Sequence, residues 1–121
     1  MTFQESIRTC LNKYTDFNGR ASLSEYWWFF LFAMLGLLLI GLITGLLAGM
    51  LGETFGLIIG GILYIGLLIP MISASTRRLH DTSRSGWWQL IGIIPLVSLV
   101  LIYFYVVSGD AGDNLYGSPP T

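Results

Sequence analysis

The sequence predicts an all-α membrane protein with an interfacial N-terminal amphipathic helix and three transmembrane helices. Three observations support this prediction: the chain has 121 residues, 54% of them are hydrophobic, and 11% are charged. A soluble domain carries about 25% charged residues, so this chain has too few charges to cover a water-soluble enzyme. Disorder is excluded because disordered chains combine low hydrophobicity with high net charge. We therefore expect a single membrane domain over residues 1–121.

The first expected element is an amphipathic helix over residues 3–14. Apolar residues recur there at helical spacing, and polar residues occupy the opposite face. The apolar face consists of Phe3, Ile7, Cys10, Leu11 and Tyr14. We expect this helix to lie in the interface of the cytoplasmic leaflet, and packing against protein is the alternative.

The spanning helices are predicted from three windows without charge, namely Tyr26–Gly52, Thr54–Thr76 and Ser85–Gly109. They contain 27, 23 and 25 residues. A bilayer core about 30 Å thick needs roughly 20 apolar residues, so each window suffices for one helix and none for two. We expect transmembrane helices over residues 27–50, 55–75 and 87–107, and an extended tail over residues 108–121.

Local signals refine these spans. Ser22 and Glu25 have the spacing of a capping box, in which Ser22 accepts from the Glu25 amide and Glu25 reaches back to the Ser22 amide. Pro70 and Pro95 each remove one backbone hydrogen bond. We expect them to kink the second and third spans, as membrane helices tolerate such prolines.

Orientation follows from the basic residues. Three of them precede the first span, three lie between the second and third spans, and none lies elsewhere. The positive-inside rule places these two segments in the cytoplasm and the C-terminal tail outside. The net charge of −1 argues against a nucleic-acid partner. Cys10 is then expected to be a reduced thiol.

Small residues predict where the helices pack. Glycines recur every fourth residue in the first span and again at the start of the second. In lipid, small residues let two helix backbones approach closely. A short connection forces these spans into a hairpin, so we expect the glycines to pack inside it, with packing between protomers as the alternative. The helix-packing candidates are Gly41, Gly45, Gly49, Gly56 and Gly60.

The candidate functional residues centre on the run from Arg77 to Ser85, which holds three arginines and the single histidine. Guanidinium groups match phosphate oxygens, so the run could bind anionic lipid headgroups or a partner. It could instead form an ion-pair network with acidic residues near the first span. A His80–Asp81 acid–base pair is disfavoured, because adjacent helix positions do not face each other. The candidates are Arg20, Glu25, Arg77, Arg78, His80, Asp81 and Arg84.

The remaining chemistry is sparse. Asp110, Asp113 and Asn114 lack the spacing of a calcium loop. We therefore expect no catalytic residue, no metal site and no cofactor. The spans contain no charged residue, which disfavours an ion-coupled transporter. An oligomeric channel or a transport accessory subunit is the alternative function.

Three runs of the sequence resemble one known family. They are Asn18-Gly19-Arg20-Ala21-Ser22 with Glu25-Tyr26-Trp27, Arg77-Arg78-Leu79-His80-Asp81-Thr82 with Arg84-Ser85 and Trp87-Trp88, and Gly112-Asp113-Asn114 with Tyr116-Gly117. This pattern is similar to the YhaH-like bacterial inner-membrane family (domain of unknown function 805). The resemblance implies a small multi-pass protein of the bacterial inner membrane.

From residues and resemblance together, we expect a non-enzymatic membrane component. Its partners would be membrane lipids, including anionic headgroups, a second copy of itself, or another membrane protein. The cytoplasmic Arg/His cluster would be the contact surface.

Overall fold

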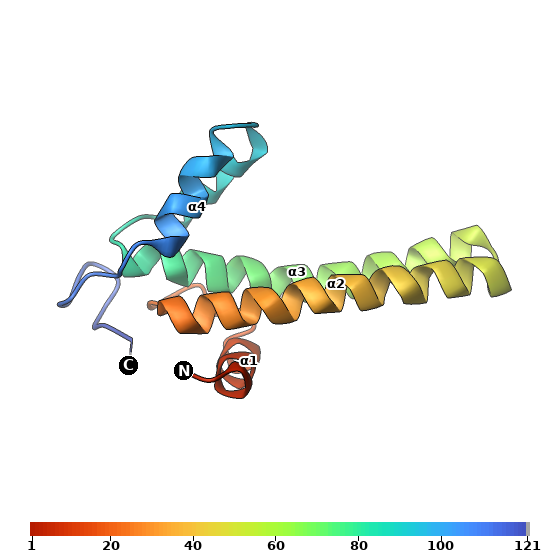
Figure 1. The fold of residues 1–121 in the computed structure, drawn as a ribbon, viewed down its shortest axis with the longest axis horizontal. Helices are drawn as coiled ribbons and strands as arrows, with labels where there is room; N and C mark the ends of the chain where they lie inside the picture. The colour runs from red at the N-terminus through yellow and green to blue at the C-terminus, as the bar shows by residue number, and fades with distance from the viewer. Residues whose placement is uncertain (121) are drawn as a thin grey trace.

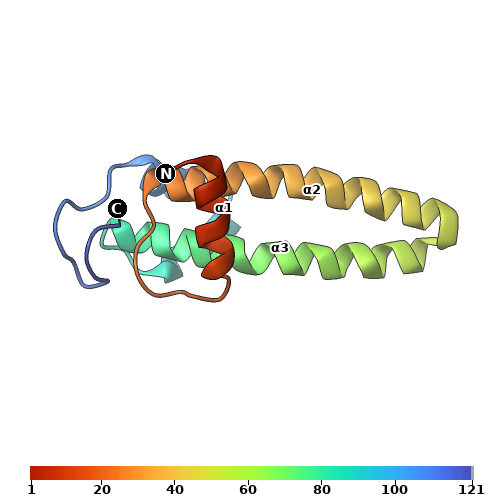
Figure 2. The ribbon, with the colours of Figure 1, turned by 90° about the horizontal axis from the view of Figure 1, so that it is seen from below.

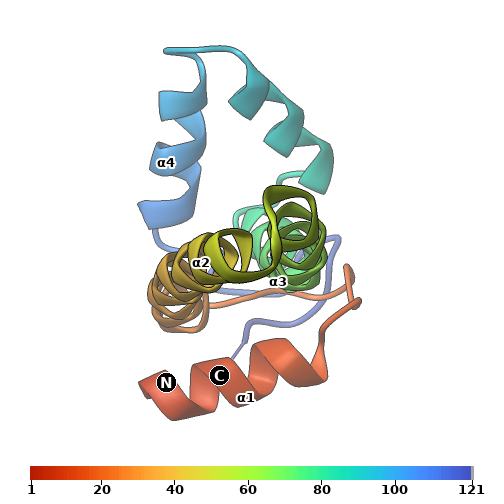
Figure 3. The ribbon, with the colours of Figure 1, turned by 90° about the vertical axis from the view of Figure 1, so that its right-hand side faces the viewer.

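The computed structural model describes residues 1–120 (Figure 1). Its elements are α1 (Phe3–Asn12), α2 (Leu23–Leu51), α3 (Glu53–Asp81), the 3-10 helix η1 (Gly86–Ile93) and α4 (Ser98–Val106). Helices α2 and α3 run side by side in opposite directions as one long hairpin (Figure 1, Figure 2). Seen along this hairpin, α1 lies on one side of it, and η1 and α4 lie on the other (Figure 3).

The α2–α3 hairpin forms because both helices are apolar over most of their length. Among residues 1–120, these two helices are long and apolar enough to cross a membrane. Each has 29 residues, which corresponds to roughly 43 Å at 1.5 Å per residue. Gly52 joins them with a φ of +103°, a conformation that glycine adopts without strain. The spans predicted over 27–50 and 55–75 lie inside α2 and α3, which confirms two long apolar helices.

The glycines of α3 allow the two long helices to approach each other. A Cβ atom at Gly56 would lie 2.7 Å from the backbone nitrogen of Ala48, and one at Gly60 would lie 2.1 Å from Thr44 Oγ1. These glycines therefore pack inside the hairpin. The glycine stripe of α2 does not pack there, because a Cβ on any of its three residues would meet nothing within 4 Å. The glycines that face away from α3 are Gly41, Gly45 and Gly49.

Helix α1 begins at a capping box, in which the Thr2 hydroxyl accepts from the Glu5 amide and the Glu5 carboxylate accepts from the Thr2 amide. The predicted helix over 3–14 is present but ends at Asn12. It crosses both long helices near the end where α2 begins (Figure 2).

Part of the α1 surface contacts the hairpin. Ser6 and Cys10 are fully buried, and Cys10 packs with Tyr26, Phe29 and Ala74. One face of α1 thus packs on the hairpin of its own chain, while its polar face stays exposed.

The third predicted span, over 87–107, is not one helix. The chain forms η1, turns around Pro95, and continues as α4. Leu96 adopts a φ of +71°, which breaks the helical path. Pro95 thus lies in a reversal of the chain, whereas the sequence predicted a kink in a continuous helix. The two short helices fold back on each other and return to the end where they began (Figure 1, Figure 3).

The tail consequently lies at the same end of the hairpin as the N-terminal segment. The Asp110 amide donates to the Asp81 carbonyl at 2.8 Å, and Arg20 donates to the Asp110 carbonyl at 2.6 Å. The expectation of a tail on the other side of the membrane from the N-terminus required a third helix that crosses to the far end of the hairpin, and the structure has instead a third apolar window that turns back. The tail was predicted over 108–121, and its residue 121 lies outside the described residues.

Candidate functional site

Charged side chains gather at the end of the hairpin where α2 begins and α3 ends. Asp81, the last residue of α3, accepts hydrogen bonds through both of its carboxylate oxygens. Arg20 Nε donates to Oδ1 at 2.9 Å, and Arg78 Nη1 donates to Oδ2. Arg20 lies in the connection before α2, and Arg78 lies one turn before Asp81 on α3. All three residues are at most 4% exposed.

A second buried ion pair lies beside the first and joins Arg77 to Glu25. Ser22 accepts from the Glu25 amide at 3.2 Å, so the predicted cap of α2 is present on the serine side. The Glu25 carboxylate does not return to Ser22, because it accepts from Arg77. Within residues 1–120, Nε and Nη2 of Arg77 are buried without a hydrogen-bond partner. We define the ion-pair cluster as Arg20, Glu25, Arg77, Arg78 and Asp81.

Helix α1 covers the pair formed by Glu25 and Arg77. The Ser6 hydroxyl donates to the Glu25 carbonyl at 2.5 Å, and Cys10 Sγ lies 4.0 Å from the same oxygen. Burial raises the pKa of the Cys10 thiol. Cys10 is therefore a protonated, inaccessible thiol in the folded protein.

Two arginines of the cluster also hold the C-terminal tail. Arg20 donates to the carbonyls of Gly112 at 2.8 Å and Asp110 at 2.6 Å. Arg78 Nε donates to the Tyr105 carbonyl at 3.1 Å. Because a guanidinium has five donors in one plane, each arginine can bind a carboxylate and several carbonyls at once. The cluster thus joins the start of α2, the end of α3 and the segment after α4.

The tail approaches the cluster so closely that a side chain would not fit at Gly109. A Cβ there would lie 1.8 Å from Asp81 Oδ2. At the next residue, the Ser83 hydroxyl donates to Asp110 Oδ2, and Asn114 Nδ2 donates to the same oxygen at 2.9 Å. These bonds hold the pKa of the Asp110 carboxyl below its usual value.

His80 lies beside the cluster and has different partners. Its Nδ1 is 3.0 Å from the Gly19 carbonyl. A carbonyl can only accept, so Nδ1 carries the proton and Nε2 carries the lone pair when the ring is neutral. The imidazole also stacks on the Tyr116 ring, with 3.9 Å between centroids and 4° between planes. His80 therefore connects the segment before α2 to the tail.

Arg84 stands apart from the ion-pair cluster. Its guanidinium carbon lies 4.0 Å from the centre of the Phe104 ring, which is a cation–π contact. Its Nη1 donates to the Thr82 carbonyl at 3.2 Å. The side chain is half-buried, so part of this charge stays at the surface.

The burial of its arginines determines whether the ion-pair cluster can contact a ligand. It combines three guanidinium groups with two carboxylates, and its arginines are at most 4% exposed. Buried charges persist when they are paired and hydrogen-bonded, as most of these are. Arg20, Arg77 and Arg78 therefore present no open surface to a lipid headgroup. The predicted contact role does not fit these three residues, whereas an ion-pair network describes their geometry.

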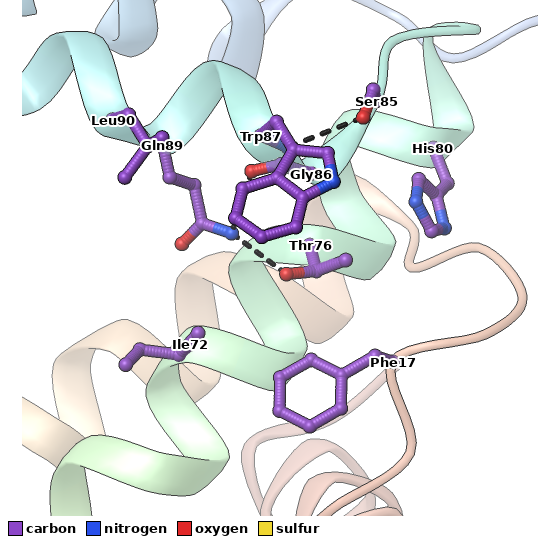
Figure 4. Close-up of a pocket in the computed structure, with 9 residues that line it drawn as sticks. All are labelled: Phe17, Ile72, Thr76, His80, Ser85, Gly86, Trp87, Gln89 and Leu90. Atoms are coloured by element: carbon purple, nitrogen blue, oxygen red, sulfur yellow. Dashed lines mark hydrogen bonds between the residues drawn. The ribbon is translucent and has the colours of Figure 1, made fainter.

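A cavity of about 600 Å³ lies between α3, η1 and the loop before α2 (Figure 4). Ile72 and Thr76 of α3 and Leu90 of η1 line it, and Phe17 lines it from the loop. Sequence reasoning did not find this cavity. The available signal was Gly86, where a Cβ would lie 2.6 Å from Thr76 Cγ2, so that glycine lets η1 approach α3.

Metal-binding chemistry is not brought together in the part of the chain that the structure describes. Within residues 1–120, no three His, Cys, Asp or Glu side chains are arranged to hold a metal ion.

Two long apolar helices with ion pairs gathered at one end define an α-helical membrane protein. Residues 14–118 match the family described as "Protein of unknown function (DUF805)", and the chain belongs to this family. It is 36% identical over 113 residues to inner membrane protein YhaH of Escherichia coli strain K12, covering 91% of each chain. It is also 36% identical over 112 residues to inner membrane protein YhaI of the same strain, covering 91% of this chain and 90% of that relative.

These relatives identify the chain as an inner membrane protein and confirm the resemblance seen in its three sequence runs. No solved structure matches the chain.

Proposed function

We propose that the chain is a non-enzymatic inner-membrane protein that interacts with lipids of the cytoplasmic leaflet. The observation that carries this proposal is the η1–α4 hairpin, whose apolar tip is exposed while its base is bound to the ion-pair cluster. Trp87, Ile93 and Leu96 are between 78% and 80% exposed, and residues 85–109 include no charge. An apolar surface of this kind marks a contact with lipid or protein.

The length of the hairpin supports insertion into one leaflet. Helix α4 has 9 residues, or roughly 14 Å. Element η1 has 8 residues, or roughly 16 Å at about 2 Å per residue. Both lengths are near half of a bilayer core about 30 Å thick, and the hairpin projects sideways from the end of α2–α3 that holds the ion-pair cluster, so it stays within the leaflet at that end (Figure 1, Figure 3). The longer α2 and α3 exceed that core by roughly 13 Å, which leaves room for α1 and the ion-pair cluster in the headgroup layer.

The distribution of basic residues supports the cytoplasmic side. All six arginines and lysines of the sequence lie near the end that holds the cluster, as the positive-inside rule requires of a cytoplasmic end. Arg8, Lys13 and Arg84 retain exposed surface. Each basic residue near an anionic leaflet contributes about 1 kcal/mol of attraction. We assign the headgroup contact to these three residues in place of the buried arginines.

The bonds of His80 and Asp81 support a non-enzymatic role. His80 binds Gly19 and stacks on Tyr116, while Asp81 accepts from Arg20 and Arg78. Neither side chain positions the other as a general acid–base pair would require.

A reporter that fluoresces only in the cytoplasm tests the placement of the tail. Fused after residue 121, it is expected to be bright, because the tail shares a side with the N-terminus. The same reporter inserted at Gly52, at the opposite end of the hairpin, is the matched control and is expected to be dark. A dark C-terminal fusion in correctly inserted protein would show that the third window crosses the membrane, and the proposal would fail.

The depth of the η1–α4 tip has its own measurement. In a Cys10→Ser background, an environment-sensitive dye on Leu96→Cys should report an apolar surrounding, as it does on Leu42→Cys of α2. The dye on Ser118→Cys of the tail should report water. A dye at residue 96 that reports water would remove the tip from the bilayer and refute leaflet insertion.

A further inference from the structure

We propose that the cavity between α3, η1 and Phe17 binds the acyl-ester region of one phospholipid, which it recognises through uncharged polar groups. This inference rests on the proposed function, because it adds a specific site to a general interaction with one leaflet. The volume of about 600 Å³ lies within the range of about 300–1,000 Å³ that is common for small-molecule sites.

The position of the cavity matches the depth of an ester linkage. It borders α3 from Ile72 to His80, directly before and beside the buried ion pairs. The part of α3 that precedes Ile72 is apolar and free of charge back to Thr54. The cavity therefore lies between the hydrocarbon core and the charged end of the hairpin. In a phospholipid, the ester groups occupy this same boundary between apolar chains and headgroup.

The apolar wall fits a hydrocarbon chain. Ile72 and Phe17 lie at one end of the cavity, and Leu90 and Trp87 come from η1 (Figure 4). Trp87 and Leu90 are exposed on the η1 surface, so an acyl chain can enter from the surrounding lipid. Aromatic side chains of this type are enriched at the membrane interface.

The polar wall offers a hydroxyl whose proton is free. Gln89 Nε2 donates to the Gly86 carbonyl at 3.2 Å and to Thr76 Oγ1 at 2.7 Å. The Gly86 carbonyl can only accept, so the amide nitrogen of Gln89 must face it. Thr76 Oγ1 is then an acceptor from Gln89 and keeps its own proton to donate to a ligand.

Two further polar groups line the same region. The Ser85 hydroxyl accepts from the Trp87 amide at 3.3 Å and also retains its proton. His80 uses Nδ1 to donate to Gly19, which leaves the Nε2 lone pair. The hydroxyls of Thr76 and Ser85 can donate to ester carbonyls, whereas the Nε2 lone pair of His80 has no partner in an ester region, which carries no hydrogen-bond donor.

The absence of charge from the lining determines the class of ligand. Within residues 1–120, no Lys, Arg, Asp or Glu lines this cavity. A phosphate would need a guanidinium or ammonium partner there, but Arg20 and Arg78 are bound to carboxylates and carbonyls, and Arg77 is fully buried. The phosphate therefore stays outside the cavity, and the site recognises the ester region independently of headgroup charge.

Photocrosslinking of the full chain tests this site. The purified protein is placed in vesicles of phosphatidylethanolamine and phosphatidylglycerol with a trace of phosphatidylethanolamine that carries a diazirine near one ester. We expect crosslinks on the cavity segments around Ile72 and Leu90. Unlabelled phosphatidylethanolamine and phosphatidylglycerol should compete to within about twofold, since the lining has no charge to prefer either.

A dialkyl ether analogue of phosphatidylethanolamine separates ester recognition from simple chain burial. It lacks the carbonyl acceptors and should compete about fivefold less well, which is the effect of one net hydrogen bond of about 1 kcal/mol. Ser85→Ala and Thr76→Val should each reduce the ester-over-ether preference. Ser108→Ala, on the exposed tail, is the matched control and should leave it unchanged. Ser85 is half-buried whereas Thr76 is buried, so Ser85→Ala keeps the test valid should Thr76→Val fail to fold.

The outcomes separate this inference from the proposed function. Crosslinks on Ile93 and Leu96 without crosslinks in the cavity would refute the site and leave the leaflet interaction standing. Equal competition by ester and ether lipids, or a preference above fivefold for the anionic lipid, would refute recognition of the ester region. A lack of crosslinks on α1, η1 and α4 and around Ile72 of α3 would overturn both.

Discussion

Replacing Asp81 with asparagine removes the carboxylate that Arg20 and Arg78 share, with little change in side-chain volume. In the folded protein, Asp81 is 4% exposed, and its two oxygens accept from the two arginines. The Asp81→Asn variant would leave three buried guanidinium groups beside one carboxylate, that of Glu25. We expect it to be strongly destabilised.

The magnitude follows from the bonds that remain. Removing one partner of a buried ion pair costs about 3–5 kcal/mol. After the substitution, Arg20 keeps the carbonyls of Gly112 and Asp110, and Arg78 keeps the carbonyl of Tyr105. These acceptors place the expected loss at the lower end, about 3 kcal/mol, or roughly 150-fold in the folding equilibrium.

Unfolding in mixed micelles, followed by tryptophan fluorescence, measures this loss. Asp113→Asn is the matched control, because Asp113 is exposed on the same tail, and we expect it to change stability by less than about 0.5 kcal/mol. Adding Arg20→Met to Asp81→Asn should cost less than the two single losses summed, since both remove one interaction. A loss below about 1 kcal/mol for Asp81→Asn would refute the reasoning that the buried pairs hold this end together.

Further predictions concern the tail and α1. The Gly109→Ala variant should be cleaved more readily in the tail by protease, because the added Cβ would lie 1.8 Å from Asp81 Oδ2. The Gly112→Ala variant is the control, since its Cβ would meet nothing within 4 Å. Equal cleavage of the two variants would contradict this prediction. Cys10 should react with maleimide roughly tenfold or more slowly in the folded protein than after unfolding, because it is buried and its pKa is raised; equal rates would place it at the surface. The pKa of Asp110 is lowered below the ordinary 3.8, so its bonds stabilise the tail above the unfolded pKa and are lost as the pH falls through the folded pKa. The protection of the tail amides, measured relative to their intrinsic exchange rates, should therefore fall in that acid range in the wild type and not in Asp110→Asn, and matching profiles would count against the assignment.

Sequence reasoning identified the two long helices because a segment must be long enough and free of charge to span a bilayer. It failed for residues 85–109, which satisfy the same two criteria. Pro95 divides that window into halves of 10 and 14 residues, 85–94 and 96–109, and each half is too short to cross a core that needs roughly 20. Whether such halves form one kinked helix or a reversal depends on their ends, which bind Arg78 and Asp81. A hydropathy pattern carries no information about these contacts with Arg78 and Asp81.

For the candidate site, too, the sequence predicted some features and only the structure shows the others. Residue type and clustering pointed to Arg77, Arg78 and Asp81, but could not say which faces of α3 they occupy or what would cover them. Burial against the start of α2 and the tail converts an apparent headgroup site into an internal network. Periodicity likewise revealed that Gly41 and its neighbours share a face. It could not show that Thr44, on another face of α2, meets α3.

The hydrogen bonds from the Arg20 side chain to the tail carbonyls also set an order of events during synthesis. Its acceptors, the carbonyls of Asp110 and Gly112, follow it by 90 and 92 residues. At about 5–20 residues per second, the ribosome needs roughly 5–20 s to make that stretch. The α2–α3 hairpin is complete in the nascent chain well before then, so its charged end must stay hydrated until the tail arrives. In a chain that stops before residue 105, Arg20 and Arg78 lack these carbonyl acceptors, and only a chain translated past residue 112 can supply all of them.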